Sequence, residues 1–460
     1  MAEGNLTDTI AAISTPVGEG GIGIVRISGK DALEIADKIF ISPRGLKPSG
    51  FKTHTIHYGT VTDKDKLIDE VILAVMLAPK SYTREDTVEI NCHSGIVALR
   101  DTLEIVLKCG ARMAEPGEFT KRAFLSGRID LAQAEAVLDI IRAKTDSALK
   151  IGVNQLKGFL SKRLNACRRM LIDMLSQLEA AIDFPEEEDM SLDFNKITGL
   201  NIKVGSILND LLDDSRLGRV FREGVHLVIC GKPNVGKSSL LNALVRKERS
   251  IVTSVPGTTR DTIEEVIDIC GIPVKVVDTA GILEPKDLVE KKAISRSRQE
   301  INSADLVIIL FDGSSKLSKE DYLLINKLKK KKAIAVINKS DLRQKVERER
   351  ILKDFDIVVD ISARRLKNIG LLEKAITGLI YGGIIINPES VMVSNLRHIQ
   401  LLLKAQKNIA QIQKSLDNKL SVEFIAHDAR EALGFLDDIL GKRFSLDLLD
   451  KIFSEFCIGK

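Results

Sequence analysis

Val225-His-Leu-Val-Ile-Cys-Gly-Lys-Pro-Asn-Val-Gly-Lys-Ser-Ser239 is the stretch of this sequence that decides its fold. The apolar run from Leu227 to Cys230 predicts a buried strand, and the leucines that begin at Leu240 predict a helix. Between them the chain matches the phosphate-binding loop Gly-x-x-x-x-Gly-Lys-Ser, whose glycines let the backbone wrap a phosphate. We expect Lys237 to reach the outer phosphates and the Ser238 hydroxyl to ligate Mg²⁺. The alternative, a chance glycine-rich turn, is disfavoured by the strand and helix on either side.

Around this loop, residues 222–381 alternate apolar runs with helical segments, which is typical of a doubly wound α/β domain. Five further strands are predicted, at 266–269, 274–278, 306–311, 333–337 and 357–361. Each of these runs ends at a polar motif. Because ligands of such sheets bind at the carboxyl ends of the strands, we expect these motifs to form one site.

The motifs at the strand ends indicate the nucleotide. Asp278-Thr-Ala-Gly281 places a carboxylate near the magnesium ion and the Gly281 N–H near the terminal phosphate. In Asn338-Lys-Ser-Asp341 the aspartate can accept the N1–H and the 2-amino protons of guanine together. Adenine has an acceptor at the first position and no group at the second, so the motif favours GTP over ATP. Ser362-Ala-Arg364 is expected to support the base from the next loop.

The segment Gly257-Thr-Thr-Arg-Asp261 lies where a nucleotide-sensing switch is expected, and Thr259 can ligate Mg²⁺ there. Ile282 occupies the position at which Ras-type enzymes carry a glutamine that orients water, so another group must do so. Asn234 has two interpretations. Its side-chain oxygen can hold a monovalent cation against the phosphates, or it is merely a turn former, and the spacing favours neither.

The rest of the chain suggests a multidomain protein, since 460 residues are enough for two to four domains. Residues 1–120 read as a mixed α/β unit, while 121–221 and 382–460 have helical periodicity on either side of the α/β domain at 222–381. This arrangement predicts a GTPase domain inserted into a discontinuous helical domain.

The composition excludes several classes of protein. The net charge of +4, from 68 basic and 64 acidic residues, neither requires nor excludes a polyanionic partner. The six cysteines form no Cys-x-x-Cys pair, so a disulfide scaffold and a zinc site are not expected. No stretch has the roughly 18 consecutive apolar residues that a membrane span requires, and we expect a cytoplasmic protein.

These motifs resemble the MnmE (TrmE) family of bacterial tRNA-modification GTPases, essentially from end to end. Outside the GTPase domain the resemblance is carried by Pro116-Gly-Glu-Phe119, Asp130-Leu-Ala-Gln-Ala-Glu135, Ala181-Ile-Asp-Phe-Pro-Glu186 and Cys457-Ile-Gly-Lys460. It implies an N-terminal α+β domain for tetrahydrofolate binding and dimerisation, a discontinuous helical domain and an inserted Ras-like P-loop GTPase domain. It also implies GTP as substrate, with Mg²⁺, K⁺ and a 5-formyl- or methylene-tetrahydrofolate as cofactors.

The resemblance assigns residues to the GTPase site. It favours Asn234 as a potassium ligand, with Thr253, Val255 and Thr258 completing the shell, and it assigns the hydrolytic water to Glu290. From spacing alone Glu290 is an ordinary solvated helix charge. The nucleotide contacts that it implies are Asn234, Val235, Gly236, Lys237, Ser238, Ser239, Thr253, Ser254, Val255, Pro256, Gly257, Thr258, Thr259, Asp278, Thr279, Ala280, Gly281, Asn338, Lys339, Asp341, Ser362, Ala363 and Arg364.

The resemblance also implies a folate site at Arg26, Glu85, Arg128 and Lys460, with Cys457 as a catalytic-site residue. A carboxylate suits the pterin amino and ring N–H groups, and cations suit the glutamyl tail. Without the resemblance each would be an ordinary surface charge. The implied function is potassium-dependent GTP hydrolysis by a homodimer. With the FAD-dependent flavoprotein MnmG, in a heterotetramer, it adds an aminomethyl or carboxymethylaminomethyl group to C5 of the wobble uridine of certain tRNAs. The rival hypothesis is an Era-like ribosome-assembly switch that modifies nothing.

Overall fold

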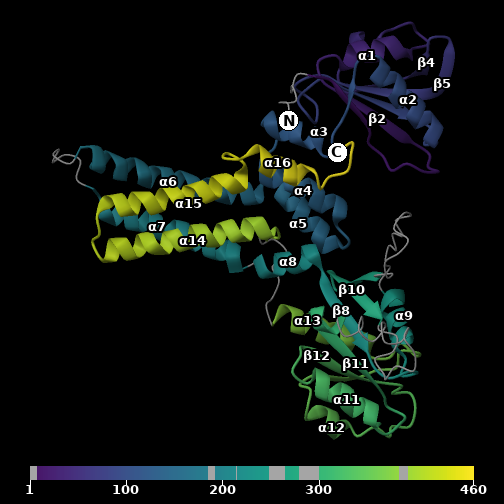
Figure 1. Cartoon of the computed structure of the whole chain (residues 1–460), viewed down its shortest axis with the longest axis vertical. Coiled ribbons are helices and arrows are strands. Elements are labelled where there is room, and N and C mark those ends of the chain that lie inside the picture. The colour runs from purple at the N-terminus through teal and green to yellow at the C-terminus, as the bar shows by residue number, and fades with distance from the viewer. Residues whose placement is uncertain (1–7, 185–191, 214, 248–264, 279–299, 383–391) are drawn as a thin grey trace. The chain divides into compact units, whose positions relative to one another are not determined.

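The computed structural model of the chain describes residues 8–184, 192–213, 215–247, 265–278, 300–382 and 392–460. They belong to two units (Figure 1), which we call unit 1 and unit 2. Unit 1 contains Met1–Leu138, Gln155–Leu192 and Ser421–Lys460, and unit 2 contains Asp139–Asn154 and Asp193–Leu420. The division into four segments at 120, 221 and 381 stays a prediction.

Unit 1 contains a sheet with the strand order β3-β4-β5-β6-β2-β1-β7. Neighbouring strands are antiparallel except β1 and β7, which are parallel. The strands are β1 (Ile10–Ile13), β2 (Gly23–Ser28), β3 (Phe40–Ile41), β4 (Thr55–Asp63), β5 (Lys66–Met76), β6 (Thr87–Cys92) and β7 (Arg112–Met113).

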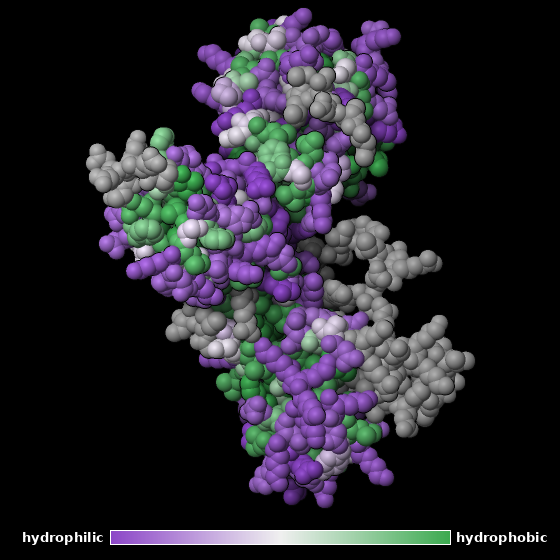
Figure 2. Space-filling view, turned by 60° about the vertical axis from the view of Figure 1, so that its left-hand side comes forward, coloured by the Kyte–Doolittle hydropathy of each residue, from purple (hydrophilic) through white to green (hydrophobic). Residues whose placement is uncertain are grey.

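Two helices, α1 (Ala32–Ile39) and α2 (Ile96–Lys108), cover one face of this sheet. Their buried side chains, such as Ile35 and Leu103, pack with alternate residues of the strands, such as Leu73 and Ile90. The other face presents apolar side chains of β4 and β5 to solvent, with Ile56 71% and Tyr58 57% exposed. Figure 2 shows hydrophobic patches on an otherwise largely hydrophilic surface.

The rest of unit 1 is helical. The short 3₁₀ helix η1 (Pro48–Gly50) contacts α1, and α3 (Glu118–Leu125) contacts α16 (Leu446–Phe453). The helix α4 (Leu131–Arg142) begins in unit 1, and the long helices α6 (Phe159–Asp183) and α15 (Val422–Leu440) pack side by side. These last two lie far apart in the sequence, as expected for a helical domain that is interrupted.

Unit 2 contains a second sheet, of order β13-β12-β11-β8-β10-β9. Its strands are parallel except β9, which is antiparallel to β10. They are β8 (Val225–Cys230), β9 (Glu265–Ile269), β10 (Ile272–Asp278), β11 (Leu306–Asp312), β12 (Ala333–Asn338) and β13 (Val358–Asp360), so the six strands predicted in this region are confirmed.

Helices cover both faces of this sheet, because successive strand residues point to opposite sides. Leu227 and Ile229 of β8 pack with α8 (Ser215–Glu223), α9 (Lys237–Lys247) and α13 (Ile369–Tyr381). Val228 and Cys230 pack on the other side with α11 (Lys319–Leu328) and α12 (Arg348–Leu352). The predicted doubly wound architecture is therefore confirmed.

Three further helices lie in the described residues of unit 2. α7 (Phe194–Asp213) and α14 (Leu396–Asp417) pack against each other, and α5 (Asp146–Leu156) sends Ile151 onto the core around β8. None of the helices in the described ranges is both long enough and apolar enough to cross a membrane.

Candidate functional site

The phosphate-binding loop joins β8 to α9 and has the backbone that its glycines predict. Gly236 has a φ of +101°, and a Cβ atom there would collide with the side-chain amide of Asn338. Lys237 begins α9, and its Nζ donates to the carbonyl oxygens of Gly231 at 3.0 Å and Lys232 at 3.1 Å. The ammonium group is therefore held against the backbone of the loop, as expected of the lysine in a phosphate-binding loop.

The loops after β12 and β13 meet the phosphate-binding loop through Asn338, which is only 3% exposed. Its amide donates to the carbonyl oxygen of Val235 at 2.8 Å, and its side-chain oxygen accepts from the backbone N–H of Ala363 at 3.0 Å. One side chain thus fixes three segments that are remote in sequence. The predicted nucleotide contacts at 234–239, 338–341 and 362–364 are brought together by it.

Asp341, the predicted base-recognition residue, is held by a neighbouring hydroxyl. Its Oδ1 accepts from the hydroxyl of Ser362 at 2.6 Å, and this hydrogen bond lowers the pKa of the Asp341 carboxyl. The exposed carboxylate therefore stays ionised and keeps acceptor capacity for two N–H groups of a purine. Lys339 has a φ of +63° and pairs with Asp312 at 2.6 Å. Burial tends to raise the pKa of Asp312, but the hydrogen bonds from Lys339 and Ser314 outweigh it and lower that pKa.

The remaining GTPase predictions fall partly outside the described residues. Asn234, Ser238 and Ser239 are exposed on the loop and the first turn of α9. The backbone of Asp278 ends β10, as predicted, but its side chain lies outside the described part of the structure. Also outside are Thr253, Ser254, Val255, Pro256, Gly257, Thr258, Thr259, Thr279, Ala280, Gly281, Ile282 and Glu290.

An ion pair that the sequence analysis missed attaches the phosphate-binding loop to α11. Lys232 Nζ lies 2.8 Å from Oδ2 of Asp321, whose side chain is 2% exposed. Asp321 is also the third residue of a capping box with Ser318, and its Oδ2 accepts the Ser318 N–H at 2.8 Å. The sequence Ser318-Lys-Glu-Asp321 could have predicted the helix start. It gave no indication of the lysine partner, which lies 89 residues earlier.

In unit 1 two of the predicted folate contacts lie close together, Arg26 on β2 and Glu85 just before β6, while Arg128 follows α3 and Lys460 ends the chain. Arg26 donates to Glu89 at 2.8 Å and to the carbonyl oxygen of Gly459 at 3.2 Å, so the last residues of the chain lie beside β2. A Cβ atom on Gly459 would meet the carbonyl oxygen of Ile13, so only glycine allows this approach. Arg26 therefore contacts the residue that directly precedes Lys460.

The other predicted residues of this group are also placed by side-chain contacts. Glu85 accepts from the hydroxyl of Ser28, two residues after Arg26 on β2, at 2.7 Å. The guanidinium carbon of Arg128 lies over the ring of Tyr82, at 4.7 Å from its centroid. Cys457 is an exposed free thiol, and its backbone oxygen accepts from the N–H of Gly117 at 3.4 Å.

A buried cation in this region was not predicted from the sequence. Arg122 is 3% exposed and pairs with three carboxylates, those of Asp8, Glu85 and Glu118. Burial tends to raise the pKa of Glu118, but the hydrogen bonds from Arg112, Glu115 and Arg122 outweigh it and lower that pKa. The spacing of Glu118 and Arg122 on α3 was a signal for one of these pairs.

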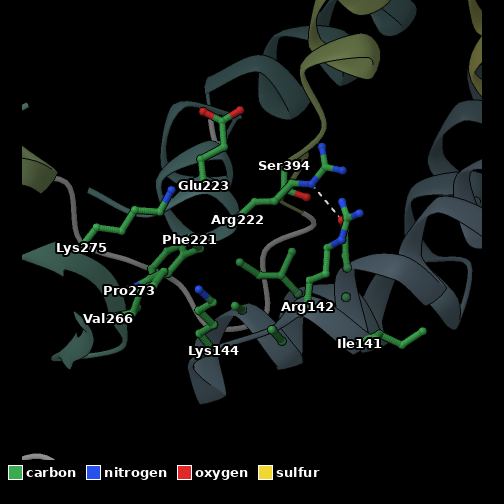
Figure 3. Close-up of a pocket in the computed structure, with 15 residues that line it drawn as sticks. Ile141, Arg142, Lys144, Phe221, Arg222, Glu223, Val266, Pro273, Lys275 and Ser394 are labelled. Atoms are coloured by element: carbon green, nitrogen blue, oxygen red, sulfur yellow. Dashed lines mark hydrogen bonds and ion pairs between the residues drawn. The ribbon is translucent and has the colours of Figure 1, made fainter. Parts of the chain in front are cut away.

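A cavity of about 680 Å³ lies at the other end of the same strands of unit 2 (Figure 3). Its lining comes from residues 139–152, the end of α8, the starts of β9 and β10, and Ser394, and its apolar members include Phe221, Val266 and Pro273. The phosphate-binding loop follows Cys230, the last residue of β8. Lys275 of the cavity lining instead pairs with His226, the second residue of β8. The two sites are therefore separate.

Two family descriptions match the chain, "GTP-binding protein TrmE N-terminus" over residues 9–128 and "MnmE helical domain" over residues 131–457. Three similar relatives are proteins called "tRNA modification GTPase MnmE". That of Clostridioides difficile is 45% identical, covering 99% of this chain and 100% of the relative. That of Bacillus subtilis is 44% identical (98% and 100%), and that of Carboxydothermus hydrogenoformans is 47% identical (99% and 100%). A solved structure of Era with MgGDPNP and a 16S ribosomal RNA segment is 29% identical, with 40% of this chain and 66% of that one covered at a TM-score of 0.29.

Proposed function

Since the chain belongs to the family of the tRNA modification GTPase MnmE, we propose that its GTP hydrolysis depends on K⁺ and drives modification of C5 of the wobble uridine. The chain is a GTP hydrolase that acts in tRNA modification. The observation that carries the nucleotide part of the proposal is the pair of hydrogen bonds by which Asn338 joins the phosphate-binding loop to the loop after β13, and the tRNA part rests on the family. Mass analysis of wobble nucleosides tests it, because cells that lack this chain should lose the aminomethyl and carboxymethylaminomethyl groups on C5.

Magnesium and potassium are the metal ions of the proposed mechanism. The exposed Ser238 at the first turn of α9 fits a magnesium ligand, and Thr259 would supply the second hydroxyl. For K⁺ the proposed ligands are Asn234, Thr253, Val255 and Thr258. When bound, the ion supplies the positive charge that an arginine finger supplies elsewhere.

One substitution separates the two interpretations of Asn234. Its φ is +63°, which asparagine adopts readily and glycine adopts without cost. Asn234→Gly therefore keeps the turn and removes the side chain with its oxygen. We expect this variant to hydrolyse GTP equally fast in KCl and NaCl. If it kept the potassium stimulation of the unaltered chain, Asn234 would be a turn former and the ion proposal would be wrong.

Glu290 is the proposed group that orients the attacking water, since Ile282 cannot do so. Glu290→Gln should lower kcat by about 100-fold or more with little change in GTP affinity. Single-turnover hydrolysis and equilibrium binding of a fluorescent GTP analogue measure the two quantities separately. An equal loss in both would assign Glu290 to nucleotide binding instead.

We also propose that Arg26, Glu85, Arg128 and Lys460 bind a tetrahydrofolate derivative, with Cys457 close to the transferred carbon. The contact of Arg26 with Gly459 supports this grouping, since it holds the C-terminal residues against β2. Titration with 5-formyltetrahydrofolate, followed by fluorescence, tests it. Arg26→Ala should abolish saturable binding, whereas Arg44→Ala, at an exposed arginine on a separate loop, should leave binding intact.

The proposed assembly is a cytoplasmic homodimer that forms a heterotetramer with the FAD-dependent MnmG. The uncovered sheet face of unit 1 supports dimerisation, because Ile56, Tyr58 and Ile72 are exposed there on two paired strands. Light scattering of a Tyr58→Glu variant tests this face. A dimer of unchanged stability would place the interface elsewhere.

A further inference from the structure

The cavity in unit 2 carries an excess of positive charge. Its lining has four basic residues and two acidic ones. Both acidic side chains are already paired with guanidinium groups: Asp139 with Arg222 at 2.8 Å, drawn as a dashed line in Figure 3, and Glu223 with Arg219 at 2.7 Å. The lining therefore has no carboxylate left over for its remaining cations.

Two of these cations are lysines, Lys144 in the loop between α4 and α5 and Lys275 in β10. Within the ranges of the chain that the structure describes, neither side chain takes part in an ion pair or a hydrogen bond. Figure 3 shows them entering from different elements, with Phe221, Pro273 and Val266 grouped near them. Unpaired charges around a concave, partly apolar wall concentrate the electrostatic field there.

The chemistry of the lining favours a polyanion over a protein partner. Protein–protein contacts depend on exposed aromatic anchors and are poor in lysine. Here the aromatic lining residue, Phe221, is only 3% exposed, while Lys144 is exposed. A lysine ammonium acts as a point charge that suits a phosphate oxygen without fixed geometry.

We propose that this cavity is a contact site for the sugar–phosphate backbone of the tRNA substrate, with Lys144 and Lys275 each neutralising a phosphate. The proposal rests on the proposed function, which supplies tRNA as the polyanion, and it locates a surface that the sequence does not. It puts RNA at the amino ends of β8 and β10, away from the nucleotide.

The salt dependence of tRNA binding tests the proposal. The probe is an unmodified transcript of a tRNA with a wobble uridine, and its affinity for the full-length chain is measured over a range of KCl concentrations. Each lost phosphate contact reduces the slope of log K against log [salt] by roughly 0.7 to 0.9. Lys144→Gln/Lys275→Gln should therefore reduce the slope by about 1.4 to 1.8 and weaken binding roughly 30-fold at about 0.1 M salt. Lys144→Arg/Lys275→Arg, which keeps both charges, should bind like the unaltered chain.

The matched control is Lys330→Gln/Lys332→Gln, which removes two exposed charges from the turn between α11 and β12. It should leave the slope unchanged, and circular dichroism should show all variants folded. If instead the control had a reduced slope and the Lys144→Gln/Lys275→Gln variant kept the slope of the unaltered chain, the RNA would lie on that turn and the proposal would be overturned. It would likewise fail if the Gln variant bound tRNA normally but lost its flavoprotein partner in a pull-down. Absence of binding by the unaltered chain would overturn the proposed tRNA function as well.

Discussion

The ion pair between Lys232 and Asp321 should stabilise the attachment of the phosphate-binding loop to α11, and its removal should lower the free energy of local unfolding of α11. The pair is 2.8 Å long, and the two side chains are 17% and 2% exposed. Asp321→Ala leaves the Lys232 ammonium largely buried without its partner and removes an acceptor from the cap of α11. Breaking one side of a buried pair costs about 3 to 5 kcal/mol.

Hydrogen exchange of the backbone amides of α11 measures this loss locally, so it does not require the whole chain to unfold in one step. A loss of about 3 to 5 kcal/mol corresponds to exchange that is between about a hundredfold and several thousandfold faster. Glu320→Ala, in the same first turn but without a partner among the described residues, should change exchange by less than about tenfold.

A double-mutant cycle decides whether the pair itself is responsible. Lys232→Met alone leaves the Asp321 carboxylate buried with only the N–H and hydroxyl of Ser318 as donors. Lys232→Met/Asp321→Ala removes both charges, so its loss of stability should be smaller than the sum of the losses of the two single variants by at least about 2 kcal/mol. Costs that simply add would show that the two charges do not interact, and the reasoning would be refuted.

Three further predictions concern the other charged and ionisable groups. Asp341→Asn should raise the KM for GTP by about 100-fold or more in steady-state hydrolysis, since the amide places a donor against the guanine N–H groups. Because the hydrogen bond from Ser362 lowers the pKa of Asp341, this carboxylate should stay ionised between pH 8 and 5, so the affinities of the unaltered chain and of Asp341→Asn for GTP should change with pH in the same way over that range. Arg122→Met should destabilise unit 1 by about 3 to 5 kcal/mol, measured by amide exchange in β1 and β2. Since the pKa of Glu118 is lowered, the stability it contributes is present above pH 4.5 and is lost as pH falls through its folded pKa, which acid titration of the same amides follows. Burial raises the pKa of the thiols of Cys92, Cys167 and Cys230 to about 11, 11 and 12. Iodoacetamide at pH 8 should therefore spare these three thiols while it labels the exposed Cys457. The stability that the three protonated thiols contribute to the folded chain should decline as pH rises from 9.

Those parts of the molecule that depend on short stretches of sequence were predictable. The alternation of apolar runs and breakers in 222–381 gave every strand of the second sheet, with bounds that differ by one or two residues. The phosphate-binding loop was predictable for the same reason, because its shape is set by glycines at fixed spacing. The grouping of Asn338 with Val235 followed from the rule that strand ends share one edge of a parallel sheet.

Apart from the Glu118–Arg122 pair within α3, the contacts between the buried charged groups were not predictable, because their partners lie far apart in the chain. Arg122 meets the Asp8 carboxylate across 114 residues, and Lys232 meets Asp321 across 89. In the sequence each of these side chains is one of 132 charged residues, most of which are solvated. These few charges affect stability because they are buried, and whether a charge is buried can be told only when its neighbours in the folded chain are known.

The contact between Arg26 and Gly459 spans 433 residues and has a consequence for how the chain assembles. Unit 1 is built from three segments, and the last of them, Ser421–Lys460, follows the whole of unit 2. Because domains fold as their residues leave the ribosome, unit 2 has all of its residues before α15 and α16 exist. Unit 1 must then close around a C-terminus whose Gly459 fits against Ile13 only without a side chain. The proposed folate contacts at Arg26 and Lys460 can therefore form only on a complete chain, so a truncated product could bind GTP but could not assemble the carbon-donor site.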